Sequence, residues 1–492
     1  MKAEAVKIKA IASVKWSALT EVVSRAVTPI TFVILARILT PQDFGIIAIA
    51  QIAISFCYLF WDAGLQKALI QTREPLEKAA NVVFWINLAL GLAIYAVLFA
   101  TAPLLATFFV SPAACAVLRV LGLQIVIGSL STVQEGLFLR DFNFKLLFWA
   151  RLATAALPAL VSIPLAYFGY GVWAIVISSL VGIFINLIIL WVRSPWRPQF
   201  CFDTGIARKM THFGSWIVVD SLIGWFISQG DAVVVGRFLG IRDLGLYRTS
   251  RNIIAVIFAL TLNPIYPMLY PAFSALHGDK EAFRSVLHKT NRIIMSLTLP
   301  IGAGIMCIAT PLVAVVLGEK WRGIETVLSI MSLQMALGWL VGANPEIYRA
   351  MGRPDVQTKI ALISLPLYLL VYLIAAPFGL TVFVLACLGL TIISVPIHIW
   401  MAVRMLNLSY LYLWETGKPM ILSTTFMVLT ISGIKWLLEI GSFIRPPIVD
   451  LFAFSIIGIL VYVGSLWLLD KSFVLQTRNM VRKSLAPNGK IA

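Results

Sequence analysis

Several charged side chains lie inside long apolar runs of this sequence, where they could do chemistry. Glu21 and Arg25 are one helical turn apart in the first run, so both side chains share one helix face and can form an ion pair. A charge inside a membrane-spanning helix costs about 2.5–3.5 kcal/mol on insertion scales, so such residues face a cavity or a partner. These charges therefore predict an internal polar site.

Three intramembrane carboxylates could exchange a proton or bind a sodium ion: Glu21, Asp220 and Asp231. Burial in a low-dielectric site disfavours the charged carboxylate, which can then be neutralised by a proton or a cation. Arg25 would keep Glu21 ionised, whereas Asp220 has no cation within one turn of its own helix. Asp220 is therefore the better candidate for ion coupling.

Arginines form the second class of candidates. Arg119 and Arg251 lie about one and a half turns in from the outer ends of their apolar runs. A guanidinium in a dry cavity can hold an anion through two parallel hydrogen bonds. The alternative for each arginine is that it reaches toward the interface or pairs with a neighbouring acid.

No catalytic constellation is present in the sequence. The five cysteines match no metal or redox spacing, and the four histidines are isolated. There is no nucleophile elbow and no glycine-rich phosphate loop. We therefore predict no metal, no cofactor and no enzymatic activity. The enzymatic alternative is a membrane glycosyltransferase or polysaccharide polymerase, which would need a larger extramembrane region to bind sugar.

The composition shows what must position these residues. Apolar residues make up 60% of the 492 residues and charged residues 12%, whereas soluble domains have about 25% charged residues. The mean hydropathy is +0.93. We predict an all-α polytopic membrane protein with about fourteen spanning helices, since each needs about 20 mostly apolar residues.

The predicted spans are 15–38, 43–69, 79–101, 114–138, 146–167, 170–192, 210–238, 246–273, 292–316, 325–348, 360–378, 380–402, 418–440 and 448–469. Pro264, Pro267 and Pro271 must bend or break the eighth.

The distribution of charge orients these spans. The net charge is +17, but the basic residues lie in short loops between apolar runs and not on one large face, which argues against nucleic acid. Most of them fall on one side if both termini are cytoplasmic, so the positive-inside rule predicts that orientation in a bacterial inner membrane. The outside turn with Arg237, Arg242 and Arg248 is the exception.

A repeated turn offers an explanation for these outside charges. VILARILTPQDFG (33–45) matches VVVGRFLGIRDLG (233–245), and AYFGYGV (166–172) matches APFGLTV (376–382) in the same order. The matched residues of the first pair are Arg37 with Arg237, Asp43 with Asp243, and Gly45 with Gly245. We interpret them as structural: the aspartate caps the next helix and the glycine allows close packing. Six spans per repeat predicts parallel halves related by an axis along the membrane normal.

Three segments carry a family resemblance: LARILTPQDFGIIAIA (35–50), DAGLQKALIQ (62–71) and FLRDFNFK (138–145). With them the chain resembles the polysaccharide transporters, or Wzx-type flippases, of the multidrug/oligosaccharidyl-lipid/polysaccharide (MOP) exporter superfamily. The resemblance implies two six-helix lobes around a central cavity, with two appended helices. The expected divisions are 1–192 (spans 1–6), 193–403 (spans 7–12), 404–470 (spans 13–14) and a cytoplasmic tail, 471–492.

The resemblance also implies a substrate, a polyprenyl-pyrophosphate-linked oligosaccharide carried from the cytoplasmic to the periplasmic leaflet by alternating access. Arg25, Arg119 and Arg251 would then bind the pyrophosphate, with Asn87 and Gln124 available for sugar hydroxyls. Expected partners are this glycan lipid, membrane lipids, H⁺ or Na⁺, and polysaccharide assembly proteins. An ion-coupled drug exporter of the same superfamily is the alternative, and it would predict a more acidic cavity.

Overall fold

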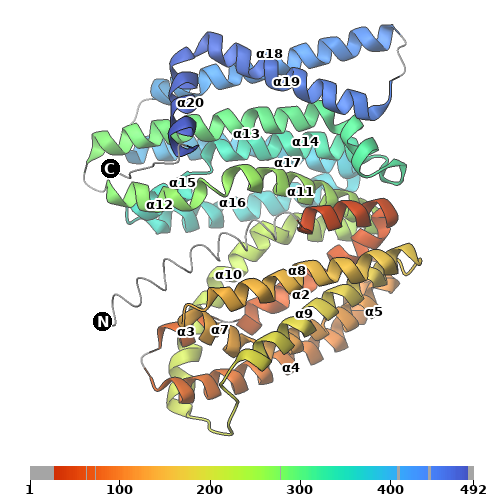
Figure 1. The fold of residues 1–492 in the computed structure, drawn as a ribbon, viewed down its shortest axis with the longest axis vertical. Coiled ribbons are helices and arrows are strands. Elements are labelled where there is room, and N and C mark those ends of the chain that lie inside the picture. Colours follow the sequence, from red (N-terminus) through yellow and green to blue (C-terminus); the bar gives the residue numbers. More distant parts are fainter. Residues whose placement is uncertain are drawn as a thin grey trace. The chain divides into compact units, whose positions relative to one another are not determined.

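A computed structural model describes most of the chain, and every regular element in the part it describes is a helix. The described residues are 27–62, 64–72, 74–276, 279–406, 410–441 and 445–485. No strand occurs among them, which confirms the all-α fold class (Figure 1).

Eleven helical segments of the described residues are long and apolar enough to cross a membrane, or twelve if one bent pair is a single span. They are Pro41–Gln71 (α2 Pro41–Asp62, α3 Leu65–Gln71), Leu76–Phe108 (α4), Pro112–Ser129 (α5 Pro112–Leu121, α6 Leu123–Ser129), Phe144–Tyr167 (α8), Val172–Arg193 (α9), Glu281–Val316 (in α13, Lys280–Val316), Ile324–Ala350 (α14 Ile324–Gly338, α15 Asn344–Ala350), Asp355–Phe378 (with α16, Pro354–Ala375), Leu380–Leu406 (α17), Glu415–Ile440 (in α18, Tyr410–Ile440) and Pro447–Leu469 (α19). Each overlaps a predicted span, and the bounds differ by up to eleven residues, at the beginning of Glu281–Val316.

The predicted total of fourteen is not confirmed. The first predicted span is described only from Val27 to Ile38, as a short apolar helix. The seventh corresponds to α10 (Thr204–Phe238), a continuous helix of 35 residues that is not among the eleven. Two shorter helices also lie outside these segments: α7 (Thr132–Arg140) and α20 (Lys471–Leu485).

The bent pair is the predicted eighth span. It consists of α11 (Gly240–Leu262) and α12 (Tyr266–Ala275), whose axes differ by 45°. Pro264 lies in the break, and a proline cannot donate the backbone hydrogen bond that would continue the helix. The prediction that prolines interrupt this span is confirmed.

The helices form two compact units. The first contains the described residues up to Thr249 together with Leu365–Pro377, and the second contains Ser250–Ser364 and the described residues from Phe378 onward. The boundaries fall inside α11 and α16, so these two helices contribute to both units. The division into lobes at residue 193 stays a prediction.

The core of the first unit joins α3, α4, α7 and the beginning of α10. Leu69, Val83, Val133, Ile206 and Met210 are buried together there. Asp203 caps α10, since its carboxylate accepts hydrogen bonds from the backbone nitrogens of Gly205 and Ile206. The cap fixes where this long helix begins, beside α3 and α4.

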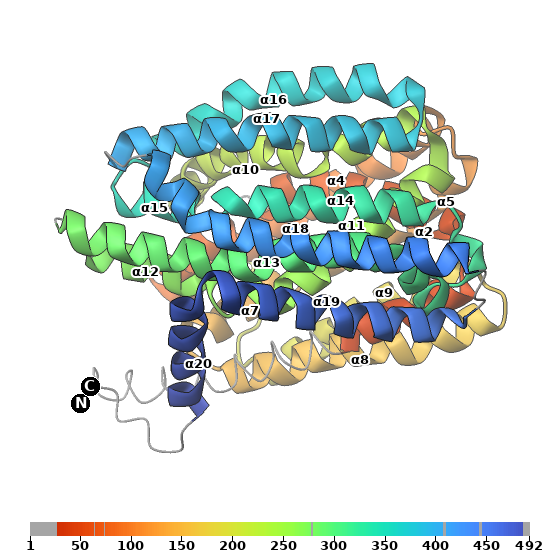
Figure 2. The ribbon, with the colours of Figure 1, turned by 90° about the horizontal axis from the view of Figure 1, so that it is seen from above.

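In the second unit, α13 packs against α14, α18 and α19 (Figure 2). A Cβ atom on Gly302 of α13 would lie 2.4 Å from the Ala336 side chain, so small residues bring α13 and α14 into backbone contact. The Ser332 hydroxyl donates to the Gly302 carbonyl oxygen at 3.0 Å. Met295 of α13 belongs to one buried cluster with Met420 of α18 and Phe454 of α19.

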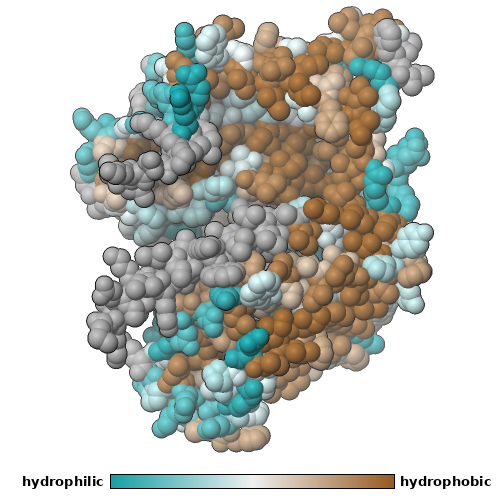
Figure 3. Space-filling view, viewed as in Figure 1, coloured by the Kyte–Doolittle hydropathy of each residue, from teal (hydrophilic) through white to brown (hydrophobic). Residues whose placement is uncertain are grey.

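Apolar side chains cover a large part of the outer surface of the helices in each unit, and hydrophilic side chains gather toward the helix ends (Figure 3). Among the exposed apolar residues are Leu160 on α8, Ile363 on α16, and Leu460 on α19. Contiguous apolar surface of this extent marks a membrane-facing protein. The space-filling view therefore agrees with the membrane-spanning assignment.

Candidate transport site

Two polar pairs tie α10 to the beginning of α11. The carboxylate of Asp231, which is 9% exposed, accepts a hydrogen bond of 2.6 Å from the Tyr247 hydroxyl and one from the backbone nitrogen of Ala232. The Gln229 side-chain oxygen accepts a hydrogen bond from Arg248. Arg248, one of the exceptional outside arginines, thus has a partner inside the protein.

The other two predicted coupling carboxylates are Glu21 and Asp220. Glu21 and its neighbour Arg25 lie outside the described residues, and Asp220 lies on α10 with only its backbone described. Trp225 lies five residues further along α10. Trp225 packs its ring against Phe56 of α2, with centroids 5.0 Å apart, and donates to the Ser55 hydroxyl at 2.9 Å. The half of α10 that follows Asp220 is therefore held against α2.

Arg119 already has protein partners. Its Nε donates to the Phe99 carbonyl oxygen at 3.3 Å, and its guanidinium lies 4.3 Å from the centre of the Phe99 ring. The Tyr95 hydroxyl donates to the Arg119 carbonyl oxygen. The contact between the Arg119 guanidinium and the Phe99 ring of α4 is a cation–π interaction. To bind a substrate anion, Arg119 would have to give up this interaction or share its guanidinium between the ring and the anion.

Arg251 lies on α11, three residues after Arg248, and belongs to the second unit. Its side chain is half-buried. Since the second unit begins at Ser250, Arg251 is the second residue of the part of α11 that leads toward the bend at Pro264.

The predicted sugar-binding amides differ in exposure. Asn87 of α4 is fully buried, and neither of its amide atoms has a hydrogen-bond partner among the described residues, whereas Gln124 of α6 is half-buried. Gln134 of α7, which was not predicted, is also fully buried, and within the described part of the chain neither of its amide atoms has a hydrogen-bond partner. Burying an amide group without a hydrogen bond costs about 1–3 kcal/mol of folding free energy per group. Asn87 on α4 and Gln134 on α7 therefore mark polar positions in the interior of the first unit.

The first copy of the repeated turn is built as a capping box followed by a helix crossing. Thr40 precedes α2, and its hydroxyl and backbone nitrogen donate to the Asp43 carboxylate at 2.7 and 2.9 Å. The Asp43 backbone nitrogen donates back to the Thr40 hydroxyl at 3.3 Å. Thr40 is therefore the capping residue and Asp43 its reciprocal partner in the first turn, which corrects the expectation that Asp43 itself is the cap.

The matched glycines lie at the same helix crossing. A Cβ atom on Gly45 would lie 2.0 Å from the Ile241 carbonyl oxygen, and one on Gly245 would lie 1.9 Å from the Pro41 carbonyl oxygen. Pro41 and Ile241 are themselves equivalent positions of the two repeats. The contact is reciprocal, as contacts across a two-fold axis are, and it supports the parallel-repeat interpretation.

The matched arginines stay at the surface of this crossing. Arg37 and Arg237 are exposed, and the Arg237 guanidinium lies 5.6 Å from the Phe108 ring and 5.9 Å from the Phe238 ring. Asp243 lies in the first turn of α11, as Asp43 does in α2. These placements favour the structural role over a chemical one for the repeated turn.

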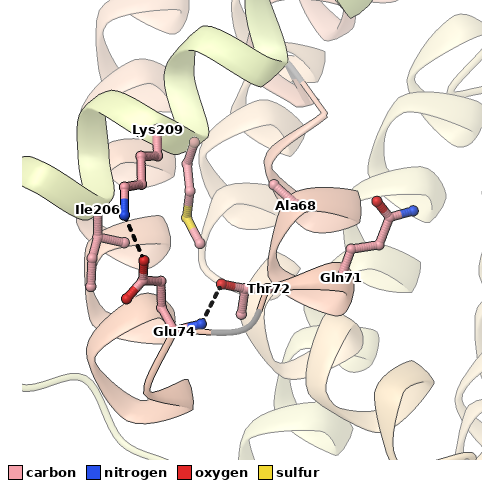
Figure 4. A pocket seen from close by; sticks show the side chains of 7 residues that line it. Ala68, Gln71, Thr72, Glu74, Ile206 and Lys209 are labelled. Carbon is pink, nitrogen blue, oxygen red and sulfur yellow. Dashed lines mark hydrogen bonds and ion pairs between the residues drawn. The ribbon is translucent and has the colours of Figure 1, made fainter.

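A pocket of about 240 Å³ opens at the other end of α10 (Figure 4). Its lining residues are Ala68, Gln71, Thr72, Glu74, Ile206, Lys209 and Met210. The Lys209 ammonium lies 2.9 Å from the Glu74 carboxylate, and the hydrogen bond and charge of Glu74 raise the pKa of Lys209. The pair is exposed, so it contributes little to stability, but it joins α10 to the segment between α3 and α4.

Tyr247 and Gln134 had no signal in the sequence. A tyrosine or glutamine in an apolar run is compatible with many environments, and only the packing of helices reveals its partner or the absence of one. The pairing of Gln229 with Arg248 likewise depends on how α10 and α11 meet at the turn.

Comparison with known proteins adds to this geometry. Residues 34–327 match the family model for polysaccharide biosynthesis proteins. The chain is 26% identical to the succinoglycan biosynthesis transport protein ExoT of Rhizobium meliloti (strain 1021) over 475 residues, which are 96% of this chain and 95% of ExoT. It is 24% identical to the lipopolysaccharide biosynthesis protein WzxC of Escherichia coli, over 71% of this chain and 72% of WzxC.

Two solved structures share the fold. The lipid II flippase MurJ in an inward closed conformation has a TM-score of 0.75 at 14% identity, over 94% of this chain and 100% of MurJ. An inward-facing multidrug transporter of the MATE family, from the MOP superfamily, has a TM-score of 0.58 at 13% identity, over 78% and 95%. The family model covers more than half of the chain and the fold agrees with it, so this chain belongs to the polysaccharide biosynthesis protein family and has the fold of MOP superfamily transporters.

Proposed function

We propose that this protein is a flippase that carries polyprenyl-pyrophosphate-linked oligosaccharide units from the cytoplasmic to the periplasmic leaflet of a bacterial inner membrane. The units would serve assembly of O-antigen, capsule or exopolysaccharide. The observation that carries the proposal is similarity to a polysaccharide transport protein along almost the whole chain, combined with the fold of a lipid II flippase.

The polar residues support transport of an anionic lipid. Arg25, Arg119 and Arg251 lie in or beside apolar runs of the sequence, where a guanidinium can bind a pyrophosphate bidentately. Both termini are proposed to be cytoplasmic. The multidrug exporter alternative is less favoured, because the named relatives act in polysaccharide biosynthesis and the flippase fold matches more of the chain than the multidrug transporter does.

A deletion strain tests this function. Lipid extracts of the strain should accumulate the complete polyprenyl-pyrophosphate-linked unit while surface polysaccharide is lost, and the intact gene should reverse both effects. Accumulation of an incomplete glycan would point to a glycosyltransferase. Normal polysaccharide with raised drug sensitivity would point to the exporter. Either result would contradict the proposal.

Ion coupling is proposed for Asp220. In proteoliposomes, Asp220→Asn should remove the response of transport to an imposed proton or sodium gradient, because the amide can neither take up a proton nor bind sodium as a carboxylate does. Glu21→Gln should instead reduce protein yield or substrate affinity, since Arg25 would lose its counter-ion. A wild-type gradient response from Asp220→Asn would assign coupling elsewhere, with Asp231 as the next candidate.

A further inference from the structure

The C-terminal helix α20 differs in direction and composition from the spans. It follows α19 after a single residue, Asp470, and runs across the direction of α18 and α19 in both ribbon views (Figures 1 and 2). α19 has 23 residues, about 35 Å at 1.5 Å per residue, which is enough to cross the hydrocarbon core. A helix that turns sideways at the end of such a span lies at the level of the lipid headgroups.

Several contacts fix this turn. The Asp470 carboxylate accepts hydrogen bonds from the Phe473 backbone nitrogen at 3.1 Å and the Ser472 hydroxyl at 2.9 Å, so it caps α20. Its other oxygen binds Arg292 of α13, whose guanidinium also lies 4.5 Å from the centre of the Phe473 ring. Burial alone would raise the pKa of Asp470, but these hydrogen bonds and the charge of Arg292 outweigh burial and lower it.

One face of α20 is occupied by the protein itself. Phe473 is buried in the cluster that contains Met295, Met420 and Leu466, and Val474 packs against the same cluster. α20 is therefore docked on the α13, α18 and α19 bundle through its first turn.

Another face carries exposed positive charge. Lys471, Arg478 and Arg482 are exposed, and at 3.6 residues per turn they fall within roughly 40° of one another around the helix. Lys471 also lies 5.2 Å from the ring of Trp467 at the end of α19, and aromatic residues are typical of the interface. The sequence of α20, KSFVLQTRNMVRKSL, contains four basic residues and no acidic residue.

We propose that the basic face of α20 is a docking surface for anionic phospholipid headgroups of the leaflet next to it. The charge of the face, its position directly after a span and its fixed crosswise direction all fit a membrane surface. The leaflet is the cytoplasmic one in the proposed orientation, but the surface does not depend on what the protein transports. The residues assigned to the substrate are not part of it.

Lipid-selective quenching tests the proposal. A bimane label is placed at Leu475→Cys, within the basic face, in the otherwise cysteine-free full-length protein. The protein is reconstituted in phosphatidylcholine vesicles that contain equal shares of phosphatidylglycerol, with either one of the two lipids brominated. Brominated phosphatidylglycerol should quench the label about twofold more than brominated phosphatidylcholine.

Charge variants identify the cause. K471Q/R478Q/R482Q should remove the difference in quenching between the two brominated lipids. Q476A, on another face of α20, should keep that difference. R478K/R482K should also keep it, because headgroup attraction needs only the positive charge. Equal quenching by the two lipids in the parent protein, or an undiminished preference in the triple glutamine variant, would overturn the proposal. Loss of the preference on adding inorganic phosphate at constant ionic strength would also overturn it, in favour of a soluble phosphate ligand.

Discussion

Gly245→Ala should lose most of its transport activity and unfold at a lower temperature, because the new methyl group would lie 1.9 Å from the Pro41 carbonyl oxygen. Backbone cannot move aside as a flexible side chain can, so α2 and α11 would have to separate by more than an ångström. Overpacking of this kind costs about 1–3 kcal/mol and sometimes more. Gly45→Ala should act in the same way through Ile241, and the two effects should not add, since one separation of the helices relieves both.

The measurements are surface polysaccharide in a complemented deletion strain and the melting temperature of the purified protein. Gly224→Ala is the matched control, since Gly224 lies on α10 in the same unit and a Cβ atom there would meet no atom of the described residues within 4 Å. That variant should behave like the parent. If Gly245→Ala melts and complements like Gly224→Ala, the helices do not meet at this crossing as described.

Arg25→Ala and Arg251→Ala should each abolish surface polysaccharide while protein abundance stays near normal. A charge-assisted bidentate contact to pyrophosphate contributes about 1.5–3 kcal/mol, so its loss should reduce transport roughly tenfold or more. Lysine at either position should restore only part of the export, because a point charge cannot form the same two parallel hydrogen bonds. Arg119→Ala should have a smaller effect, since Arg119 is already engaged by Phe99.

Arg237→Ala provides the control for loss of an arginine as such. Arg237 is exposed and lies over two aromatic rings at the repeated turn, and no substrate role is proposed for it. Export by this variant should remain near that of the parent protein. Full export by both Arg25→Ala and Arg251→Ala would remove these residues from the mechanism.

The sequence was sufficient to predict the parts of the fold that depend on the bilayer. Bilayer thickness sets the length of a span, so α8 and α9 were located to within two residues at each end. The break between α11 and α12 was also predictable, because proline removes a hydrogen-bond donor wherever the chain folds. The equivalence of Gly45 and Gly245 was also predictable, because it follows from the internal sequence repeat alone.

The contacts between helices could not be predicted in the same way. That Asp231 accepts from Tyr247 depends on how α10 and α11 are rotated about their axes, and many rotations suit the same apolar pattern. The extent of α10, a single helix of 35 residues from Thr204, depends on packing against α2 and α3. The crosswise direction of α20 likewise depends on Arg292, which is remote in sequence.

Leaflet translocation in proteoliposomes tests the central claim most directly. Vesicles containing the purified protein and a fluorescent polyprenyl-pyrophosphate oligosaccharide are treated with an impermeant reagent that destroys fluorescence in the outer leaflet. With a transport-competent protein, most of the fluorescence should be lost, and vesicles with Arg251→Ala should retain the half that lies in the inner leaflet. The wild-type protein is measured with a proton or sodium gradient imposed in each direction. If its vesicles also retain that half of the fluorescence, the assignment as a flippase is contradicted.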